Sequence, residues 1–274
     1  MALMLAGHPL PPPNVVKVDW KVNQRFSVAD DPDRTDPKSF TWQDPGFLLS
    51  KNPIEFRGRT TVEELDLKGN YIDGYHDGYS FARVIHNVLD DEDCAQLMKQ
   101  VNDKGFTPAL LNIGRGYQQW APDIRDGLRV IIDSPPLTKH LLEVIRPHLP
   151  DFIPINVQCG VELVELNERC RFLCYTPGQE FEAHCDGRYT RTNGDESRVT
   201  VQFYLHDVPP ENGGATTFLG RGPGGQQIKL ECNPRAGSAL IFTQDLLHEG
   251  SRLEKGLKYT MRTEAMYRRI ARKG

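Results

Sequence analysis

The chain has 274 residues, of which 38% are hydrophobic and 26% are charged, and its formal net charge is −4 at pH 7. This length suffices for one large domain, or for one domain with an extension, and such a core needs no disulfide or structural metal. The small net charge gives no reason to expect a nucleic-acid partner. No run of 18 apolar residues occurs, so neither a transmembrane helix nor membrane association is expected.

Cysteine spacing and the opening residues bear on the compartment. The six cysteines are scattered without the spacing of a disulfide framework, and there is no N-glycosylation sequon. Residues 1–13 are briefly apolar but lack a basic start, and we interpret them as a surface tail rather than a signal peptide. The expected location is therefore the cytoplasm or the nucleus.

Residues 1–80 are rich in Asp, Pro, Gly and Lys and show little periodicity, which is typical of loop. Scattered aromatic side chains would hold this stretch against a core: Trp20, Phe26, Trp42, Phe47 and Phe56. We expect an N-terminal extension that packs on the following domain or is partly disordered.

Residues 81–150 predict a strand followed by two helices. Residues 81–88 alternate as a strand does. A helix is expected to open with Asp90 or Asp91 as its cap, followed by an acidic first turn, and to stop at Gly105. A second helix is expected from Ser134 through residue 149. Both carry an apolar stripe typical of core packing, so the histidines of the second helix receive no chemical role.

After Pro150 the chain predicts eight short strands separated by Gly/Pro-rich turns. They cover residues 161–166, 170–176, 180–185, 198–205, 215–219, 227–232, 238–243 and 259–267. Helices that precede strands, instead of alternating with them, indicate an α+β protein whose strands form an antiparallel sandwich or barrel.

Three side chains in this region have the chemistry of a metal site. His184 and Asp186 are two residues apart on a predicted strand, so both point to the same face. His248 is the natural third ligand. Two histidines and one carboxylate can hold Fe(II) and leave positions open for other ligands. A His-x-Asp spacing alone is weak evidence, because a strand end with two polar residues gives the same pattern.

A candidate anion site follows the distal histidine. Lys258 lies ten residues after His248, and strand parity places Lys258, Thr260 and Arg262 on one face. A cation that faces the interior is costly unless an anion pairs with it. Lys258 and Arg262 are competing candidates, since the planar fork of an arginine suits a carboxylate well.

Several motifs in order resemble one known family. Residues 171–187 (RFLCYTPGQEFEAHCDG), the Gly-Gly-Ala-Thr-Thr-Phe turn at 213–218 and residues 234–267 resemble the prolyl-4-hydroxylase-like branch of the Fe(II)/2-oxoglutarate-dependent oxygenase superfamily. The likeness extends over residues 81–270. It implies that Tyr175 hydrogen-bonds 2-oxoglutarate, that Thr216 lines its pocket and that Lys258 is the basic residue of that pocket.

The resemblance also implies fold and activity. We expect a double-stranded β-helix (jelly roll, cupin-like) with flanking N-terminal helices, an oxygenase domain over residues 81–274 and a catalytic jelly roll over about 155–270. The expected cofactors are Fe(II), 2-oxoglutarate as co-substrate and O2, with ascorbate as a stimulant. The expected reaction is hydroxylation of a C–H bond with release of succinate and CO2.

The substrate and the oligomeric state stay open. A prolyl residue of a protein or peptide is the first candidate substrate, and a small molecule is the second. Tyr259 stands where collagen-type relatives carry a tryptophan, which argues against collagen-like substrates. Two alternatives stand beside this interpretation: a non-catalytic jelly-roll binding module, and a zinc or manganese cupin-like enzyme that uses the same ligands.

Other motifs are expected to be structural. The Gly-x-Gly-x-x-Gly of residues 220–225 precedes a strand, so it is interpreted as a hairpin tip and not a phosphate loop. Cys170 and Cys174 are expected to be buried, and His206 to have a structural role. Residues 112–120 are a candidate lid.

Overall fold

The computed structural model describes residues 4–5, 8–10, 12–27, 46–156 and 159–271. The predicted anchor Trp42, part of the tail at 1–13 and most of the loop around residues 28–45 lie outside the described residues. No helix in the described ranges is long and apolar enough to cross a membrane.

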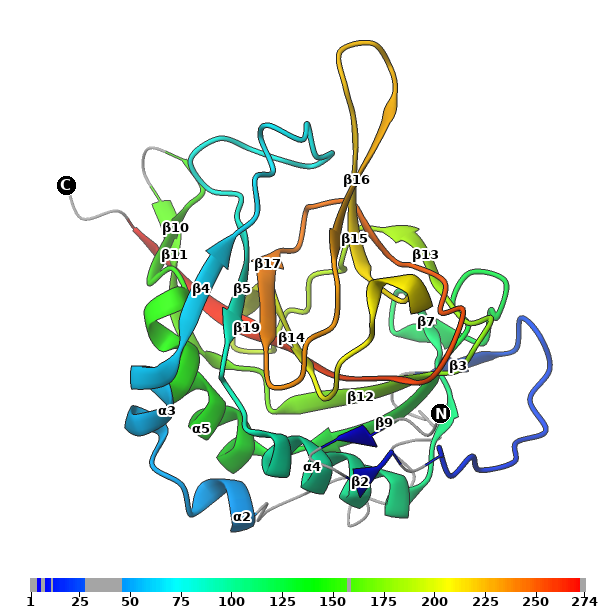
Figure 1. Ribbon diagram of the computed structural model, residues 1–274. Coiled ribbons are helices and arrows are strands. Elements are labelled where there is room, and N and C mark those ends of the chain that lie inside the picture. The colour runs from blue at the N-terminus through cyan, green and yellow to red at the C-terminus, as the bar shows by residue number, and fades with distance from the viewer. Residues whose placement is uncertain (1–3, 6–7, 11, 28–45, 157–158, 272–274) are drawn as a thin grey trace.

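A ten-stranded antiparallel sheet forms the larger layer of the molecule (Figure 1). Its main path runs in the order β4-β5-β17-β14-β19-β12-β9-β6, and β11 joins β19 to β10. The strands are β4 (Thr61–Glu64), β5 (Ala82–His86), β6 (Thr107–Pro108), β9 (Leu128–Asp133), β10 (Phe152–Pro154), β11 (Cys159–Leu166), β12 (Arg169–Tyr175), β14 (Glu196–Tyr204), β17 (Ala239–Thr243) and β19 (Lys258–Ala271).

A four-stranded antiparallel sheet packs against part of the larger one. It consists, in order, of β13 (Phe181–His184), β18 (His248–Gly250), β15 (Thr216–Arg221) and β16 (Gln227–Cys232). Buried side chains of β14 and β17 meet those of β15 and β16 in one apolar cluster, so the sheets enclose a common interior. This arrangement is the double-stranded β-helix, and the predicted α+β jelly-roll class is confirmed. All eight strands predicted after Pro150 have a counterpart.

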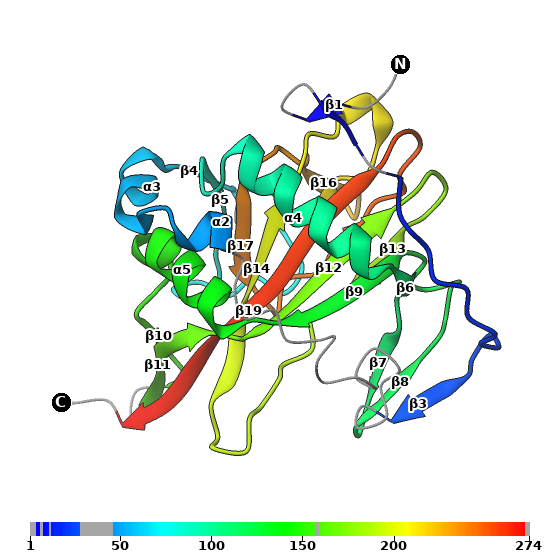
Figure 2. The same ribbon diagram turned by 90° about the horizontal axis from the view of Figure 1, so that it is seen from below.

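Helices cover the outer face of the larger sheet (Figure 2). They are α2 (Gly46–Leu49), α3 (Pro53–Arg59), α4 (Asp91–Lys104) and α5 (Pro135–Ile145), with 3-10 turns at Arg146–His148 and Pro210–Asn212. The main apolar cluster joins Leu97 of α4 and Leu141 of α5 to sheet residues such as Phe172. The main hydrophobic core therefore lies between the helices and the larger sheet. The opposite face of that sheet packs against the four-stranded sheet.

Both predicted long helices are confirmed, and their ends have local causes. Asp90 caps α4: its side chain accepts from the backbone N–H of Asp93, and the Asp93 carboxylate accepts from the Asp90 N–H. The helix stops at Gly105, whose φ of +87° a glycine adopts without strain. Helix α5 is shorter than predicted, because the chain tightens into a 3-10 turn from Arg146.

The predicted segregation of strands after the helices is incomplete. Strands β4, β5, β6 and β9 precede residue 150 and belong to the ten-stranded sheet. Strand β9 lies between α4 and α5 in the chain, and it was not predicted because Leu128–Ile132 is a continuous buried run without alternation. A jelly roll limited to about 155–270 omits these strands, and a boundary at residue 80 separates β4 from its partner β5.

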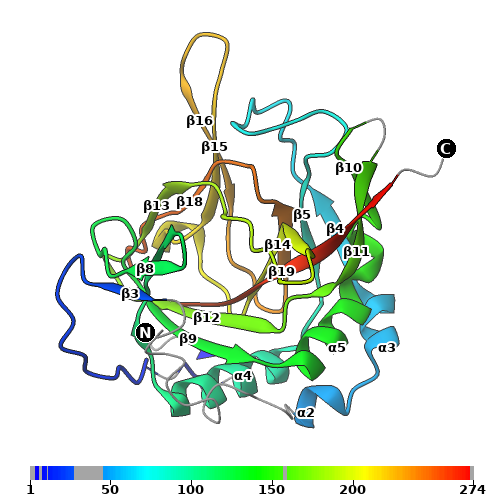
Figure 3. The ribbon, with the colours of Figure 1, turned by 180° about the vertical axis from the view of Figure 1, so that it is seen from behind.

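Short sheets complete the molecule. Strands β3 (Arg25–Ser27), β7 (Leu111–Gly114) and β8 (Tyr117–Gln119) form a three-stranded sheet that lies near β13 (Figure 3). Strands β1 (Met4–Leu5) and β2 (His8–Pro9) form a two-stranded one. The candidate lid at 112–120 is thus the β7–β8 hairpin. The glycine-rich segment 220–225 ends β15 and turns into β16, so no helix follows it, as predicted.

Candidate metal centre

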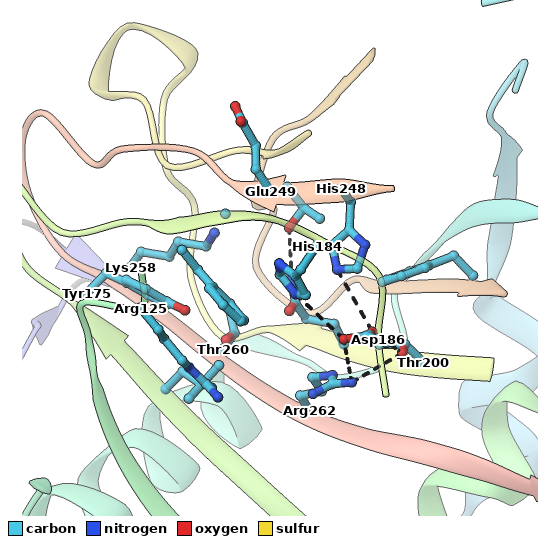
Figure 4. A pocket seen from close by; sticks show the side chains of 16 residues that line it. Arg125, Tyr175, His184, Asp186, Thr200, His248, Glu249, Lys258, Thr260 and Arg262 are labelled. Atoms are coloured by element: carbon cyan, nitrogen blue, oxygen red, sulfur yellow. Dashed lines mark hydrogen bonds and ion pairs between the residues drawn. The ribbon is translucent and has the colours of Figure 1, made fainter. Parts of the chain in front are cut away.

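His184, Asp186 and His248 lie together at one end of the four-stranded sheet. One ligand atom from each lies within 4.8 Å of the others. His184 ends β13 and His248 begins β18, and these two residues are directly paired across the antiparallel ladder. Asp186 follows two residues after His184, so strand geometry carries its carboxylate to the same side. Figure 4 shows the three side chains converging.

Backbone carbonyls orient both imidazoles. The Nδ1–H of His184 donates to the Glu182 carbonyl at 2.7 Å, and the Nδ1–H of His248 donates to the Leu246 carbonyl at 2.9 Å. Because a carbonyl oxygen can only accept, each Nδ1 carries the proton and each Nε2 keeps its lone pair free. The Nε2 atoms face the Asp186 carboxylate at 3.7 and 3.9 Å. This is the orientation that a metal-binding histidine needs.

Asp186 is fixed from its outer side. The Arg262 guanidinium lies 2.8 Å from its Oδ1, and the Thr200 hydroxyl donates to its Oδ2. Burial alone would raise the pKa of Asp186, but Arg262 and the two histidines hold that pKa well below its usual range. Burial lowers the pKa of His248 to about 4. The site therefore offers the Asp186 carboxylate and the neutral imidazole of His248 at neutral pH.

A cavity of about 450 Å³, its mouth included, opens from this cluster. Both sheets contribute to its wall, and its other end carries Lys258 and Tyr175, which are directly paired between β19 and β12. The Lys258 ammonium lies 5.3 Å from the centre of the Tyr175 ring (Figure 4).

Lys258 is a buried cation without a carboxylate partner among the described residues. It is 4% exposed, and burial lowers its pKa to about 8. The Thr260 hydroxyl, on the same face of β19, is also buried and has no hydrogen-bond partner in the described part of the chain. Buried groups of this kind are costly unless a ligand satisfies them.

The other predicted pocket residues have defined contacts. Thr216 lines the cavity, and its Oγ1 accepts from Gln202 and from Tyr204, at 2.9 Å each. Arg262, predicted as a competing clamp, also lines the cavity but pairs with Asp186 and lies 3.8 Å from Glu264. Of the two candidate clamps, only Lys258 is without an anionic partner in the ranges the structure describes.

The pocket residues that sequence reasoning missed include Arg125, Thr200 and Phe181. Thr200 shares a face of β14 with Gln202, but a threonine in a strand gives no signal of its own. Arg125 lies in a loop before β9, a strand that was itself missed.

Residues for which no chemical role was predicted have structural contacts. Cys170 and Cys174 are fully buried, as predicted. His206 donates to the Asp207 carbonyl and accepts from the Tyr259 N–H, which is a structural role. The Cys185 thiol faces the Asp245 carbonyl at 3.4 Å. In the loop after Asp186, Arg191 pairs with Glu165 and Glu168.

The donor set fits a divalent iron ion. Two histidine nitrogens and one carboxylate on a single face are the ligands of non-haem Fe(II) oxygenases, and they leave positions for a chelating co-substrate. The buried, unpaired Lys258 fits the far carboxylate of a keto diacid.

Comparison with known families agrees with this geometry. Residues 170–263 match the family described as the 2OG-Fe(II) oxygenase superfamily. The chain is thus similar to that superfamily over the part that forms the metal site. The matched segment contains His184, Asp186 and His248, together with Tyr175, Thr216, Lys258 and Arg262. The predicted recognition of the superfamily is confirmed, and the family implies Fe(II), 2-oxoglutarate and O2.

Solved structures with a similar outline are other oxygenases. A viral collagen prolyl hydroxylase from Paramecium bursaria Chlorella virus-1 is 20% identical, with 68% of this chain and 95% of that chain covered, at a TM-score of 0.44. A Trichoplax adhaerens prolyl hydroxylase in complex with a hypoxia-inducible-factor peptide is 16% identical, with 81% and 93% covered, at 0.49. A Pseudomonas putida prolyl-4-hydroxylase is 17% identical, with 64% and 82% covered, at 0.41. Identities and TM-scores this low say nothing about substrate. No curated protein matches the chain.

Proposed function

We propose that this protein is an Fe(II)- and 2-oxoglutarate-dependent dioxygenase that hydroxylates a C–H bond of its substrate. The observation that carries the proposal is the pairing, in one cavity, of the His184, Asp186 and His248 cluster with the buried and unpaired Lys258. A metal-binding triad alone fits many enzymes, whereas a lone buried ammonium across the same cavity calls for a co-substrate with a far carboxylate.

In this proposal His184, Asp186 and His248 hold iron. When bound, iron(II) and 2-oxoglutarate supply the activation of dioxygen and the oxidising power, with succinate and CO2 as products. Asp186 contributes one negative charge against the two positive charges of the ion, and Lys258 contributes one more positive charge. The positive charges of the ion and of Lys258 would therefore attract a dianion into the cavity.

The remaining pocket residues position these groups. Lys258 would pair with the far carboxylate of 2-oxoglutarate, and the hydroxyls of Tyr175 and Thr260 would donate to its oxygens. Thr216 would line the same end. Arg262 and Thr200 would hold the Asp186 carboxylate in place from behind, so that its orientation does not depend on the metal.

The substrate class rests on the resemblance. A prolyl residue of a protein or peptide is our first candidate, and a small molecule is the second. Tyr259, which departs from the tryptophan of collagen-type relatives, is 1% exposed and packs near Phe106 and His206 in the core. Its identity therefore bears on packing more than on the cavity wall.

Succinate release tests the proposal. Protein purified anaerobically and supplied with iron(II), 2-oxoglutarate and ascorbate should show a visible metal-to-ligand charge-transfer band and, on exposure to oxygen, iron-dependent succinate formation. Asp186→Ala should lower that rate by more than about 100-fold, because it removes a ligand and not merely an outer contact.

The same measurements separate the alternatives. A binding module would give no succinate with iron, and a zinc or manganese enzyme would retain its own metal and give no charge-transfer band. Wild-type turnover by the Asp186→Ala variant would refute the assignment of the triad.

A further inference from the structure

Arg125 is a second cation in the cavity whose charge no described residue neutralises. It lies in the loop before β9 and is joined to Phe181 by an isolated antiparallel bridge. Its Nη1 donates to the Leu110 carbonyl at 3.1 Å. Its Nε is buried without a partner, and none of its nitrogens forms an ion pair within the described part of the chain. At least the Nε–H donor of the guanidinium is thus unused.

Ring contacts fix where this guanidinium lies. Its central carbon is 4.8 Å from the centre of the Phe181 ring, and Phe181 stacks on His184 at 3.7 Å between ring centres. Arg125 is therefore separated from a proposed iron ligand by one aromatic ring. Figure 4 shows it on the side of the cavity where Tyr175 lies. A group bound to Arg125 would be close to the reacting centre without displacing the metal ligands.

The other charges of the cavity are accounted for. Arg262 is neutralised by Asp186, and Glu249 accepts from Lys229 at 3.1 Å and from Ser251 at 2.9 Å. Lys258 is assigned to 2-oxoglutarate in the proposed function. Arg125 remains. Burial lowers the pKa of Arg125 only to about 10, so its guanidinium is charged at neutral pH.

We propose that Arg125 binds a carboxylate of the primary substrate, and that this substrate is a small free carboxylic acid such as an amino acid. The inference rests on the proposed function and deepens it by choosing the second candidate substrate, a small molecule, over a prolyl residue of a protein or peptide. The planar guanidinium fork matches a carboxylate, and a buried cation is costly unless an anion arrives with the ligand. An internal prolyl residue, whose carbonyl is an amide, would leave Arg125 unpaired.

Matched acids and amides test this inference. The probes are the proteinogenic L-amino acids with L-proline foremost, their carboxamides such as L-prolinamide, and a proline peptide with blocked ends. Binding to the anaerobic iron(II)–2-oxoglutarate complex is measured by calorimetry, and succinate release is then measured in air. We expect at least one free acid to bind and to stimulate succinate release, with its amide weaker by at least about tenfold.

Variants then assign the effect to Arg125. Arg125→Gln should raise the Kd and KM of the preferred acid by about tenfold or more and abolish the discrimination between acid and amide, while Arg125→Lys should restore part of it. Arg252→Gln is the matched control, because Arg252 is half exposed, pairs with Glu180 and does not line the cavity. It should discriminate as the wild type does.

Several results would overturn the inference. These are equal use of acid and amide, a preference for the blocked peptide over every free acid, no binding of any free acid, or unchanged discrimination in Arg125→Gln. A rise in the Kd of 2-oxoglutarate that exceeds the rise for the acid would assign Arg125 to the co-substrate and equally overturn it. Failure of the proposed function looks different: the wild type would then form no charge-transfer complex, and the inference would fall with it.

Discussion

Lys258 shows how a single residue links the fold to the chemistry. It begins β19, faces the cavity and is 4% exposed, so its ammonium is largely removed from bulk water. Burial lowers its pKa to about 8, which is close to physiological pH. A lysine in this position binds a carboxylate only while it is protonated, and the affinity for the co-substrate should therefore depend on pH.

We predict an alkaline limit to co-substrate use. A lysine is charged below its pKa, so kcat/KM for 2-oxoglutarate should be at its plateau below about pH 7 and fall above the Lys258 pKa of about 8. The decline should approach about tenfold per pH unit. Steady-state kinetics from pH 6 to 10 measure it. The arginine of Lys258→Arg keeps its charge over this range, so this variant should lose the alkaline decline in kcat/KM. An identical decline in that variant would refute the role of Lys258.

Arg262 is predicted to act on the metal and not on the co-substrate. Its guanidinium is 2.8 Å from Asp186, so Arg262→Gln should free that carboxylate to rotate and weaken iron(II) binding by about 10- to 100-fold. Lys258→Ala should instead raise the Kd of 2-oxoglutarate and change iron affinity little. Anaerobic titration of the metal and of the co-substrate separates the two effects. If Arg262→Gln raises the Kd of 2-oxoglutarate more than Lys258→Ala does, the clamp is Arg262.

Residue patterns alone predicted part of this site. His184 and Asp186 are linked by local strand geometry, so their common direction follows from a spacing of two. The order of Tyr175, Thr216, His248 and Lys258 was accessible through family resemblance. Arg125 was not, because its place in the cavity depends on its bridge to Phe181 and on packing between segments that are far apart in the sequence.

At the scale of elements, register decides which side chains meet. The β13–β18 ladder sets His184 opposite His248, and the β12–β19 ladder sets Tyr175 opposite Lys258. A shift by one residue would turn each of these side chains to the other face. Alternation in the sequence predicts strands and faces, but it does not state which residues of two distant strands are paired.

The missed strand has a related explanation. Strand β9 is covered by helices on one side. All of its residues pair with β12, over Arg169 to Cys174 of that strand. Both faces are buried, and Arg129 is the one charged residue within the run Leu128–Ile132, so the alternation that reveals an amphipathic strand is absent. The turn that leads into β9 is also close to the site: a Cβ at Gly127 would lie 2.9 Å from the Tyr175 ring. A glycine there lets the ring lie against the backbone.

At the scale of the whole molecule, residues before 80 are part of the sheet and the core. Strand β4 pairs with β5 over four residues, and Ile72 forms a bridge to Gly220 of β15. A Cβ at Gly220 would lie 2.2 Å from the Tyr71 carbonyl, so the backbone of this segment is in close contact with the four-stranded sheet. The stretch that the sequence describes as loop thus touches both layers.

We therefore predict that residues 81–274 do not form a stable domain alone. Removing residues 1–80 exposes the edge of β5 and deletes four core side chains that are at most 4% exposed: Leu48, Phe56, Leu67 and Ile72. At roughly 1.5–3 kcal/mol for each buried side chain, their loss approaches the total stability of about 5–15 kcal/mol of a typical domain. Residues 46–274 keep all four and β4, and should retain a single cooperative thermal transition, whereas residues 81–274 should aggregate or unfold without one. Circular dichroism melts of the two proteins decide the matter. A transition of residues 81–274 within a few degrees of that of residues 46–274 would mean that the domain does begin near residue 81, and that β4 and the loop after it only lie against a sheet that is stable without them.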